Sequence, residues 1–232
     1  MNEPRNLTRS QPNYPPMLRK LADAPDALRH IGITLPLDTP MVAIVGARDC
    51  TRHAKNAAYR LAGDLTEKGY LIVSGMAAGI DSAAHRGALD AGGLTVAVLG
   101  CGVDVCYPSE NRELYRRIIR NGLILSEYAE GTKPNHGSFL QRNRLIAGMS
   151  IGMIIAESGI GGGTRNAAAH ARRYGRILMG EPNVSPDKTS AGVRDLIDNH
   201  GAIPVSTGAA AEEALAQASV LYQHALARFQ NQ

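Results

Sequence analysis

The chain has 232 residues and a mass of 24.6 kDa, enough for one full α/β domain with a buried core, whereas two complete domains would be cramped. Hydrophobic residues make up 44% and charged residues 20%, with 25 glycines and 12 prolines, which excludes a disordered or low-complexity chain. The net charge of +4 permits a nucleic-acid partner without requiring one.

The cysteines and the hydropathy pattern indicate in which cellular compartment the protein is expected. Cys50, Cys101 and Cys106 are odd in number and lack metal-site spacing, so we expect neither a disulfide framework nor a metal site. Residues 1–11 lack an apolar signal-peptide core, and no run approaches the roughly 18 apolar residues of a membrane span. The sequence therefore predicts a cytoplasmic protein without a membrane partner.

The predicted elements begin with a proline-interrupted lead-in over residues 1–40, which contains a short helix at 25–30. Continuous apolar runs then predict strands at 41–46, 70–74, 95–99, 123–126, 151–156 and 176–179. Helix formers between them predict helices at 52–68, 81–91, 110–120, 138–149 and 164–174. This alternation is typical of a Rossmann-like, doubly wound, mostly parallel sheet with helices on both faces.

Polar residues follow the first two predicted strands, where ligands of such sheets bind. Arg48 comes after the first strand beside Gly46, in a position suited to a phosphate, although pairing with a surface carboxylate explains it equally well. The second strand runs into Ser74 and Gly75, which begin a glycine turn. The glycine spacing matches neither the dinucleotide fingerprint nor a Walker motif, so we expect no NAD, ATP or other cofactor.

Candidate catalytic groups are few. Asp81 and His85 lie four residues apart on one helix face, where a structural hydrogen bond is the favoured interpretation over a general base. Cys101 and Cys106 lie on a loop after a strand, but the sequence shows no His/Asp arrangement to activate them. We therefore expect a protein that is not an enzyme.

The segment at 131–150 combines a loop with the first turns of a helix. It carries Lys133, Phe139, Arg142, Asn143 and Arg144. Cations, an amide, a ring and a helix N-terminus are what a phosphate backbone and a stacked base require. Phe139 in the core and the arginines as solvated charges are the alternative. Arginines at the positive end of a helix nevertheless favour an anionic partner.

A second glycine-rich loop follows the fifth predicted strand. It includes Gly162, Gly163 and Thr164 at a junction between strand and helix, which suits an anion as well. Two such loops on one edge of a sheet predict a shared binding site.

Several of these motifs occur together in one order and resemble those of the DNA-processing protein A (DprA/Smf) family. The motifs are Val45-Gly46-Ala47-Arg48, Ser74-Gly75, Ile80-Asp81, Tyr107-Pro108, Ser126-Glu127-Tyr128, Phe139 and Arg142-Asn143-Arg144. The resemblance covers roughly residues 14–205. It implies a Rossmann-like core that binds single-stranded DNA in a basic pocket, forms a homodimer and helps to load the RecA recombinase during DNA uptake or recombination, including natural transformation.

Carried over by resemblance, the phosphate-binding arginine corresponds to Arg48, and the serine-glycine loop to Ser74 and Gly75. The aromatic and basic helix corresponds to Phe139, Arg142, Asn143 and Arg144, with Lys133 on the loop before it. Residues 41–208 would then be the DNA-binding domain, between the lead-in at 1–40 and an amphipathic helix at 209–232 that packs on the sheet or on another subunit.

A related superfamily supplies the alternative function. The glycine-threonine run also resembles that of cytokinin-activating phosphoribohydrolases, in which the loop continues to a catalytic glutamate. Ala167 stands at that position here. A nucleotide-binding or phosphoribohydrolase-like enzyme thus remains the second hypothesis, and the missing carboxylate argues against hydrolysis.

Overall fold

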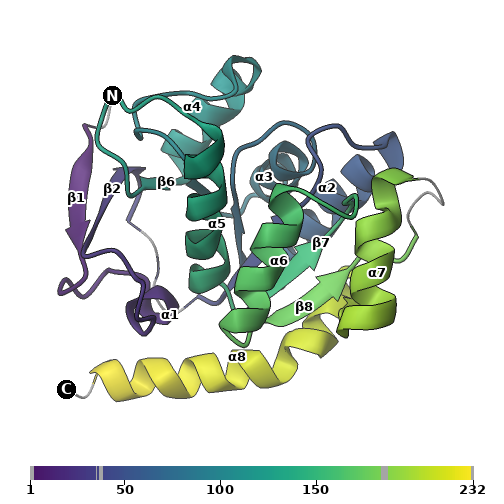
Figure 1. Cartoon of the computed structure of the whole chain (residues 1–232). Helices are drawn as coiled ribbons and strands as arrows, with labels where there is room; N and C mark the ends of the chain where they lie inside the picture. The colour runs from purple at the N-terminus through teal and green to yellow at the C-terminus, as the bar shows by residue number, and fades with distance from the viewer. Residues whose placement is uncertain (1–2, 35, 37–38, 184–187, 231–232) are drawn as a thin grey trace.

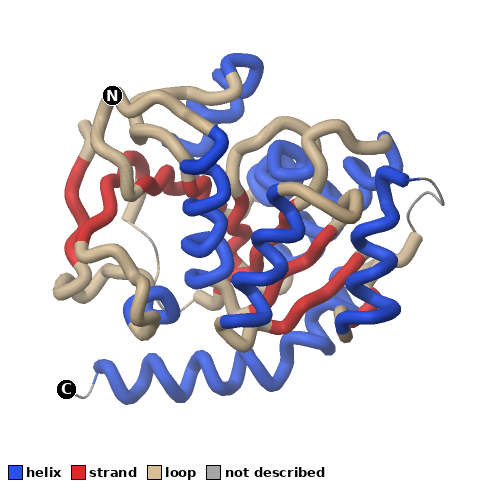
Figure 2. Tube along the Cα trace, in the orientation of Figure 1, coloured by secondary structure: helices blue, strands red, loops and turns tan. Residues whose placement is uncertain are grey.

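The computed structural model of the chain describes residues 3–34, 36, 39–183 and 188–230. Within them, one nine-stranded sheet has the order β1-β2-β6-β5-β4-β3-β7-β8-β9. Helices cover both faces of this sheet (Figures 1 and 2). The Rossmann-like, mostly parallel α/β fold predicted from the sequence is confirmed.

Seven strands form the parallel part of the sheet. They are β3 (Met41–Val45), β4 (Leu71–Ser74), β5 (Thr95–Val98), β6 (Gly122–Ser126), β7 (Gly152–Ile155), β8 (Ile177–Gly180) and β9 (Ile203–Pro204). The chain adds β4, β5 and β6 on one side of β3 and β7, β8 and β9 on the other. The strand order therefore reverses between β3 and β7.

The helices pack on the sheet in two layers. They are α2 (Arg52–Glu67), α3 (Ile80–Asp90), α4 (Arg112–Asn121), α5 (His136–Met149), α6 (Gly163–Arg173), α7 (Ala191–His200) and α8 (Gly208–Gln230). Met41, Ala43 and Val45 of β3 join the core under α5, α6 and α7. Val42 and Ile44 face the opposite core, with α2, α3 and α8. This alternation explains the continuous apolar run in the sequence.

The lead-in contributes two strands that the sequence analysis did not predict. β1 (Arg5–Thr8) pairs antiparallel with β2 (Ala27–Gly32), which pairs antiparallel with β6, and the short α1 (Pro16–Arg19) lies between them in sequence. The helix predicted at 25–30 is therefore wrong. Leu28 and Ile31 are buried in different cores on opposite faces of β2, so pairing with β6 and burial override local helix propensity.

Helix α8 crosses one face of the sheet, in agreement with the predicted amphipathic helix. Leu215, Tyr222 and Leu226 are buried in the core shared with α2 and β3. Val220 and Leu221 are 55% and 68% exposed. Among the described residues, no helix is both long enough and apolar enough to cross a membrane.

Candidate nucleic-acid interface

A cavity of about 340 Å³ opens where the strand order reverses. Its walls come from the loop after β3, the loop after β7, and the N-terminal parts of α5 and α6. Ligands of doubly wound sheets bind at this switch point, beyond the carboxyl ends of the strands. Ala77 of the turn after β4 and Gly161 and Gly163 of the loop after β7 line this same cavity, so the two glycine-rich loops predicted to share a site do meet.

The loop after β3 is held closely against the end of β7. Gly46 has no room for a Cβ atom, which would lie 2.8 Å from the Glu157 carbonyl oxygen, and the Ala47 amide donates to that oxygen at 2.8 Å. The buried Glu157 carboxylate accepts from the Thr51 amide and hydroxyl, at 2.8 and 3.0 Å, and from the Ser190 hydroxyl at 3.1 Å. These bonds fix the direction in which the loop leaves the sheet.

Arg48 stands on this braced loop and is exposed. Its guanidinium lies 4.8 Å from the centre of the Phe139 ring, and its side chain lines the cavity. Within the described part of the chain, no hydrogen bond or ion pair holds the Arg48 guanidinium. The pairing with a surface carboxylate considered above is thus not found, and the cation is available to an anionic ligand.

Phe139 and Arg48 line two cavities. A second cavity of about 110 Å³ is lined by these two residues together with Gly75, Tyr107 and Arg142. The Phe139 and Tyr107 rings stack with their centres 5.4 Å apart and their planes at 27°. Phe139 is half-buried, so it belongs partly to the core and partly to the site.

Arg142 is buried, so the alternative interpretation of it as a solvated surface charge is wrong, whereas its predicted contact with DNA stays a prediction. It is 4% exposed, and Nη1 donates to the carbonyls of Gly75, at 2.7 Å, and Val98. Nε donates to the Asn143 side chain at 3.2 Å. No hydrogen bond from Nη2 is found among the described residues, and the side chain lines both cavities. Arg142 therefore contributes positive charge to both cavities from a buried position.

A buried carboxylate faces this arginine. Asp81 accepts from the amides of Gly75, at 3.1 Å, and Ala77, at 3.4 Å, and so closes the turn after β4. Burial raises the pKa of Asp81, while the positive charge of Arg142 acts in the opposite direction. Asp81 lies in the first turn of α3, and Gly79 takes the N-cap position.

His85 is structural, as favoured from the sequence, but its partner is Thr95. Its Nδ1 lies 2.7 Å from the Thr95 hydroxyl, and the ring is fully buried. Burial lowers the pKa of His85 to about 3. A histidine in this position lines neither cavity, so it cannot meet a ligand there as a general base.

Ser74 and Gly75 support the site from within. The Ser74 side chain is buried and its hydroxyl donates to the Ile44 carbonyl at 2.6 Å. The prediction that this side chain is open to a ligand is therefore wrong. Gly75 lines the smaller cavity against the Arg142 guanidinium.

The glycine loop after β7 ends at the N-terminus of α6. Gly162 takes the N-cap position with φ of +91°, in the left-handed region that favours glycine. Gly163 and Thr164 line the larger cavity. Asn143 is 8% exposed and donates to the Gly163 carbonyl at 3.0 Å and to the Asn166 side chain at 3.1 Å. Asn143 thus ties this loop to α5 and has little surface of its own.

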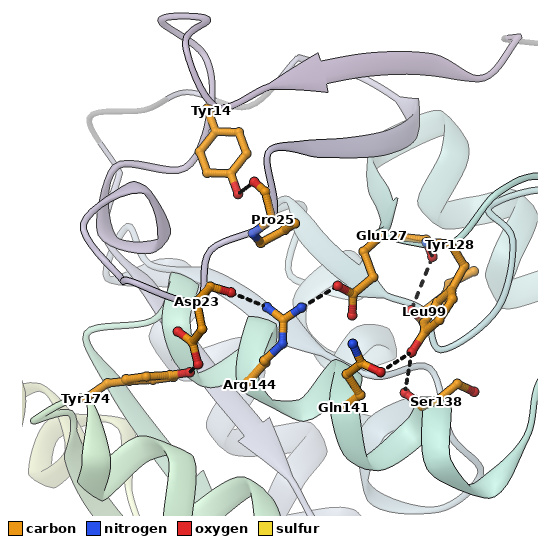
Figure 3. A network of polar contacts seen from close by, with 11 residues as sticks. Tyr14, Asp23, Pro25, Leu99, Glu127, Tyr128, Ser138, Gln141, Arg144 and Tyr174 are labelled. Atoms are coloured by element: carbon orange, nitrogen blue, oxygen red, sulfur yellow. Dashed lines mark hydrogen bonds and ion pairs between the residues drawn. The ribbon is translucent and has the colours of Figure 1, made fainter.

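Arg144 points away from the cavity, so the predicted convergence is wrong for this residue. Figure 3 shows its guanidinium between the Asp23 carbonyl, at 2.8 Å, and the Glu127 carboxylate. The Tyr174 hydroxyl donates to the Asp23 carboxylate at 2.6 Å in the same network. Arg144 therefore fastens the N-terminal segment to α5. Lys133 is exposed on the loop before α5 and lines neither cavity.

Two residues shape the site although the sequence analysis gave them no role. Glu157 lies two residues after the last residue of the buried strand β7, a position that marks a candidate at a sheet edge. Tyr107 follows the β5 strand at the end of a loop, and only its contact with Phe139 reveals its place. Neither role could be assigned without the tertiary pairing.

This fold and site define a Rossmann-like protein with a charged cavity at its topological switch point. The family model described as DNA recombination-mediator protein A matches residues 5–216, and the chain belongs to this family. The resemblance found in the sequence is thereby confirmed.

Individual relatives agree with this assignment. Protein Smf of Synechocystis is 39% identical over 208 residues, which cover 88% of this chain and 52% of that protein, so the chain spans about half of this relative. The X-ray structure of DNA processing protein A from Streptococcus pneumoniae has a TM-score of 0.85 at 36% identity, over 90% of this chain and 73% of that one. The Helicobacter pylori structure, described as giving insight into that protein's single-stranded DNA binding mode, has a TM-score of 0.82 at 33% identity, over 94% and 99%.

Proposed function

We propose that this protein binds single-stranded DNA at the cavity edge and helps to load the RecA recombinase onto it in DNA uptake, as in natural competence and transformation, or in recombination. One observation carries the proposal: Arg48 is an exposed cation without an ion pair among the described residues, at a cavity onto which the α6 N-terminus opens. Family membership and the DNA binding described for the Helicobacter pylori relative support it. Such a role implies action in the cytoplasm.

The chemistry of the site suits a phosphate backbone. Arg48 supplies a cation that can donate two parallel hydrogen bonds to phosphate oxygens. The amides at Gly163 and Thr164 lie at a helix N-terminus, where the helix dipole favours an anion. The buried Arg142 adds a fixed positive charge, and the exposed Lys133 offers a further contact as the strand leaves the cavity.

Titration of the protein with a fluorescently labelled oligothymidylate, followed by anisotropy at several salt concentrations, tests this proposal. We expect saturable binding that weakens as salt rises, because bound phosphates release counterions. An unlabelled duplex of equal length should compete less well than the single strand. Absence of binding at low salt, or equal competition by the duplex, would contradict the proposed function.

An assay for hydrolysis of nucleoside monophosphates by the same protein preparation tests the alternative hypothesis of a nucleotide hydrolase. Ala167 is 2% exposed and lines the larger cavity, and an alanine cannot supply the carboxylate of the related hydrolases. We expect no free base from nucleoside monophosphates above a heat-treated control. Release of base, with no oligonucleotide binding, would favour the enzyme.

We further propose a homodimer, because α8 leaves Val220 and Leu221 exposed beside its buried face. Light scattering at tens of micromolar should give twice the mass of the chain. A monomeric mass would contradict the dimer.

The proposed role in RecA loading is tested by the assembly of RecA filaments on single-stranded DNA. Assembly should be faster when this protein is added before RecA. An unchanged rate would contradict a role in RecA loading.

A further inference from the structure

Tyr107 is one of the few large apolar side chains that the structure leaves open to solvent. The residue is 41% exposed, whereas Phe139, whose ring stacks against the Tyr107 ring, is half-buried. Exposed aromatic rings beside a cationic groove are the usual platforms for the bases of a single strand. The position of Tyr107 next to Arg48 and Arg142, around the smaller cavity, meets this description.

Phe139, the ring expected from the sequence to stack on a base, already has protein partners. The Arg48 guanidinium lies 4.8 Å from its centre and the Tyr107 ring 5.4 Å from its centre. Gly100 lies so close to the ring that a Cβ atom there would be 2.8 Å from it. An incoming base therefore meets Tyr107 first, with Phe139 as the layer below.

The loop that carries Tyr107 is fixed to the rest of the site. The buried Asn111 side chain donates to the Met76 carbonyl and to the Ser82 hydroxyl, both at 2.8 Å, and so ties the loop to the turn after β4 and to α3. The Tyr115 hydroxyl donates to the Val103 carbonyl on the preceding stretch. A ring held on a braced loop loses little conformational freedom when a base stacks on it.

We propose that Tyr107 is the base-stacking residue of the single-strand site, resting on Phe139, while the phosphate beside that base binds Arg48. This inference rests on the proposed function, because it names the contact that a nucleobase makes at the same site. Stacking uses the ring face, so the contact accepts any base, and the Tyr107 hydroxyl is not required.

Substitution of Tyr107 tests the proposal by oligonucleotide affinity. Tyr107→Ala should weaken binding about five- to hundredfold with little change in salt slope, because loss of stacking releases no counterions. Tyr107→Phe should bind as the wild type does. Tyr59→Ala is the matched control, since Tyr59 is 43% exposed on α2 and its hydroxyl bonds to Asp90. It should leave affinity unchanged.

The chain has no tryptophan, so Tyr107→Trp creates a single fluorescent reporter. Its emission should be quenched by an oligothymidylate and much less by an abasic oligonucleotide of the same length bound to saturation. Equal quenching by both, or wild-type affinity of Tyr107→Ala when Arg48→Ala binds weakly, would overturn the stacking role and leave DNA binding intact. Failure of the wild type to bind any oligonucleotide would overturn both proposals.

Discussion

Arginine has opposite roles at the cavity edge and on the flank of α5, the side of this helix that contacts the N-terminal segment. Arg48 at the cavity edge is exposed and has only a ring beside it, whereas Arg144 on the flank is held by the Asp23 carbonyl and the Glu127 carboxylate. Arg142 lies between these extremes, buried but lining the cavities. Charge alone thus does not separate these arginines, and Arg48 is the one proposed to bind a ligand because no partner holds its guanidinium among the described residues.

The largest expected effect is on stability, at Arg142. Arg142→Ala removes the hydrogen bonds to Gly75 and Val98 and leaves the buried Asp81 carboxylate without its nearby positive charge. We expect the free energy of unfolding to fall by about 3 to 6 kcal/mol, because two buried carbonyl groups each lose a hydrogen bond from a charged donor. Urea denaturation followed by circular dichroism measures it. A loss below about 1 kcal/mol would show that Arg142 is not a structural brace.

Arg144→Ala should have a smaller effect, because the pair it forms is less deeply buried. The side chains of Arg144 and Glu127 are 14% and 12% exposed, and burial already raises the pKa of Glu127 while Arg144 lowers it. We expect a loss of roughly 2 kcal/mol, typical of hydrogen bonds to charged groups. Oligonucleotide affinity and its salt slope should be those of the wild type. A reduced salt slope would instead indicate that Arg144 contacts DNA and would contradict its purely structural role.

The buried His85 makes the free energy of unfolding depend on pH. Its pKa is about 3 in the folded chain and about 6.5 when unfolded, so the unfolded state binds the extra proton as pH falls through this window. Stability should therefore fall with pH, by about 2 kcal/mol from this residue between pH 7 and pH 5. His85→Asn should flatten that part of the stability curve in urea melts. Equal slopes in both proteins would mean that His85 is not held neutral.

The sequence predicts the parallel core well because its signals are local. The run at β3 is apolar at every position, since its residues alternate between two cores, and the same holds at β7. β2 was missed because its pairing with β6 joins residues 91 to 97 positions apart, from Gly32 opposite Leu123 to Arg29 opposite Ser126. Periodicity within one segment carries no information on such a partner.

The candidate site was predicted in outline for the same reason. Post-strand position brought Arg48, Gly163 and Thr164 to one cavity. The two arginines of α5 could not be told apart, because their roles depend on the Gly75 carbonyl in one case and on Glu127 in the other. Gly75 lies 67 residues from Arg142 and Glu127 lies 17 residues from Arg144, so both contacts are outside helix periodicity and only the folded chain shows which arginine is already bound.

The salt dependence of oligothymidylate binding by Arg48→Ala tests most directly whether the unpaired arginine is the phosphate contact. Arg48 is exposed and unpaired among the described residues, so the substitution should change the free energy of unfolding by no more than about 0.5 kcal/mol. Affinity should fall, and the magnitude of the slope of log K against log salt should drop by about 0.7, the value for one contact on a single strand. Wild-type affinity and slope in a folded Arg48→Ala protein would contradict the account.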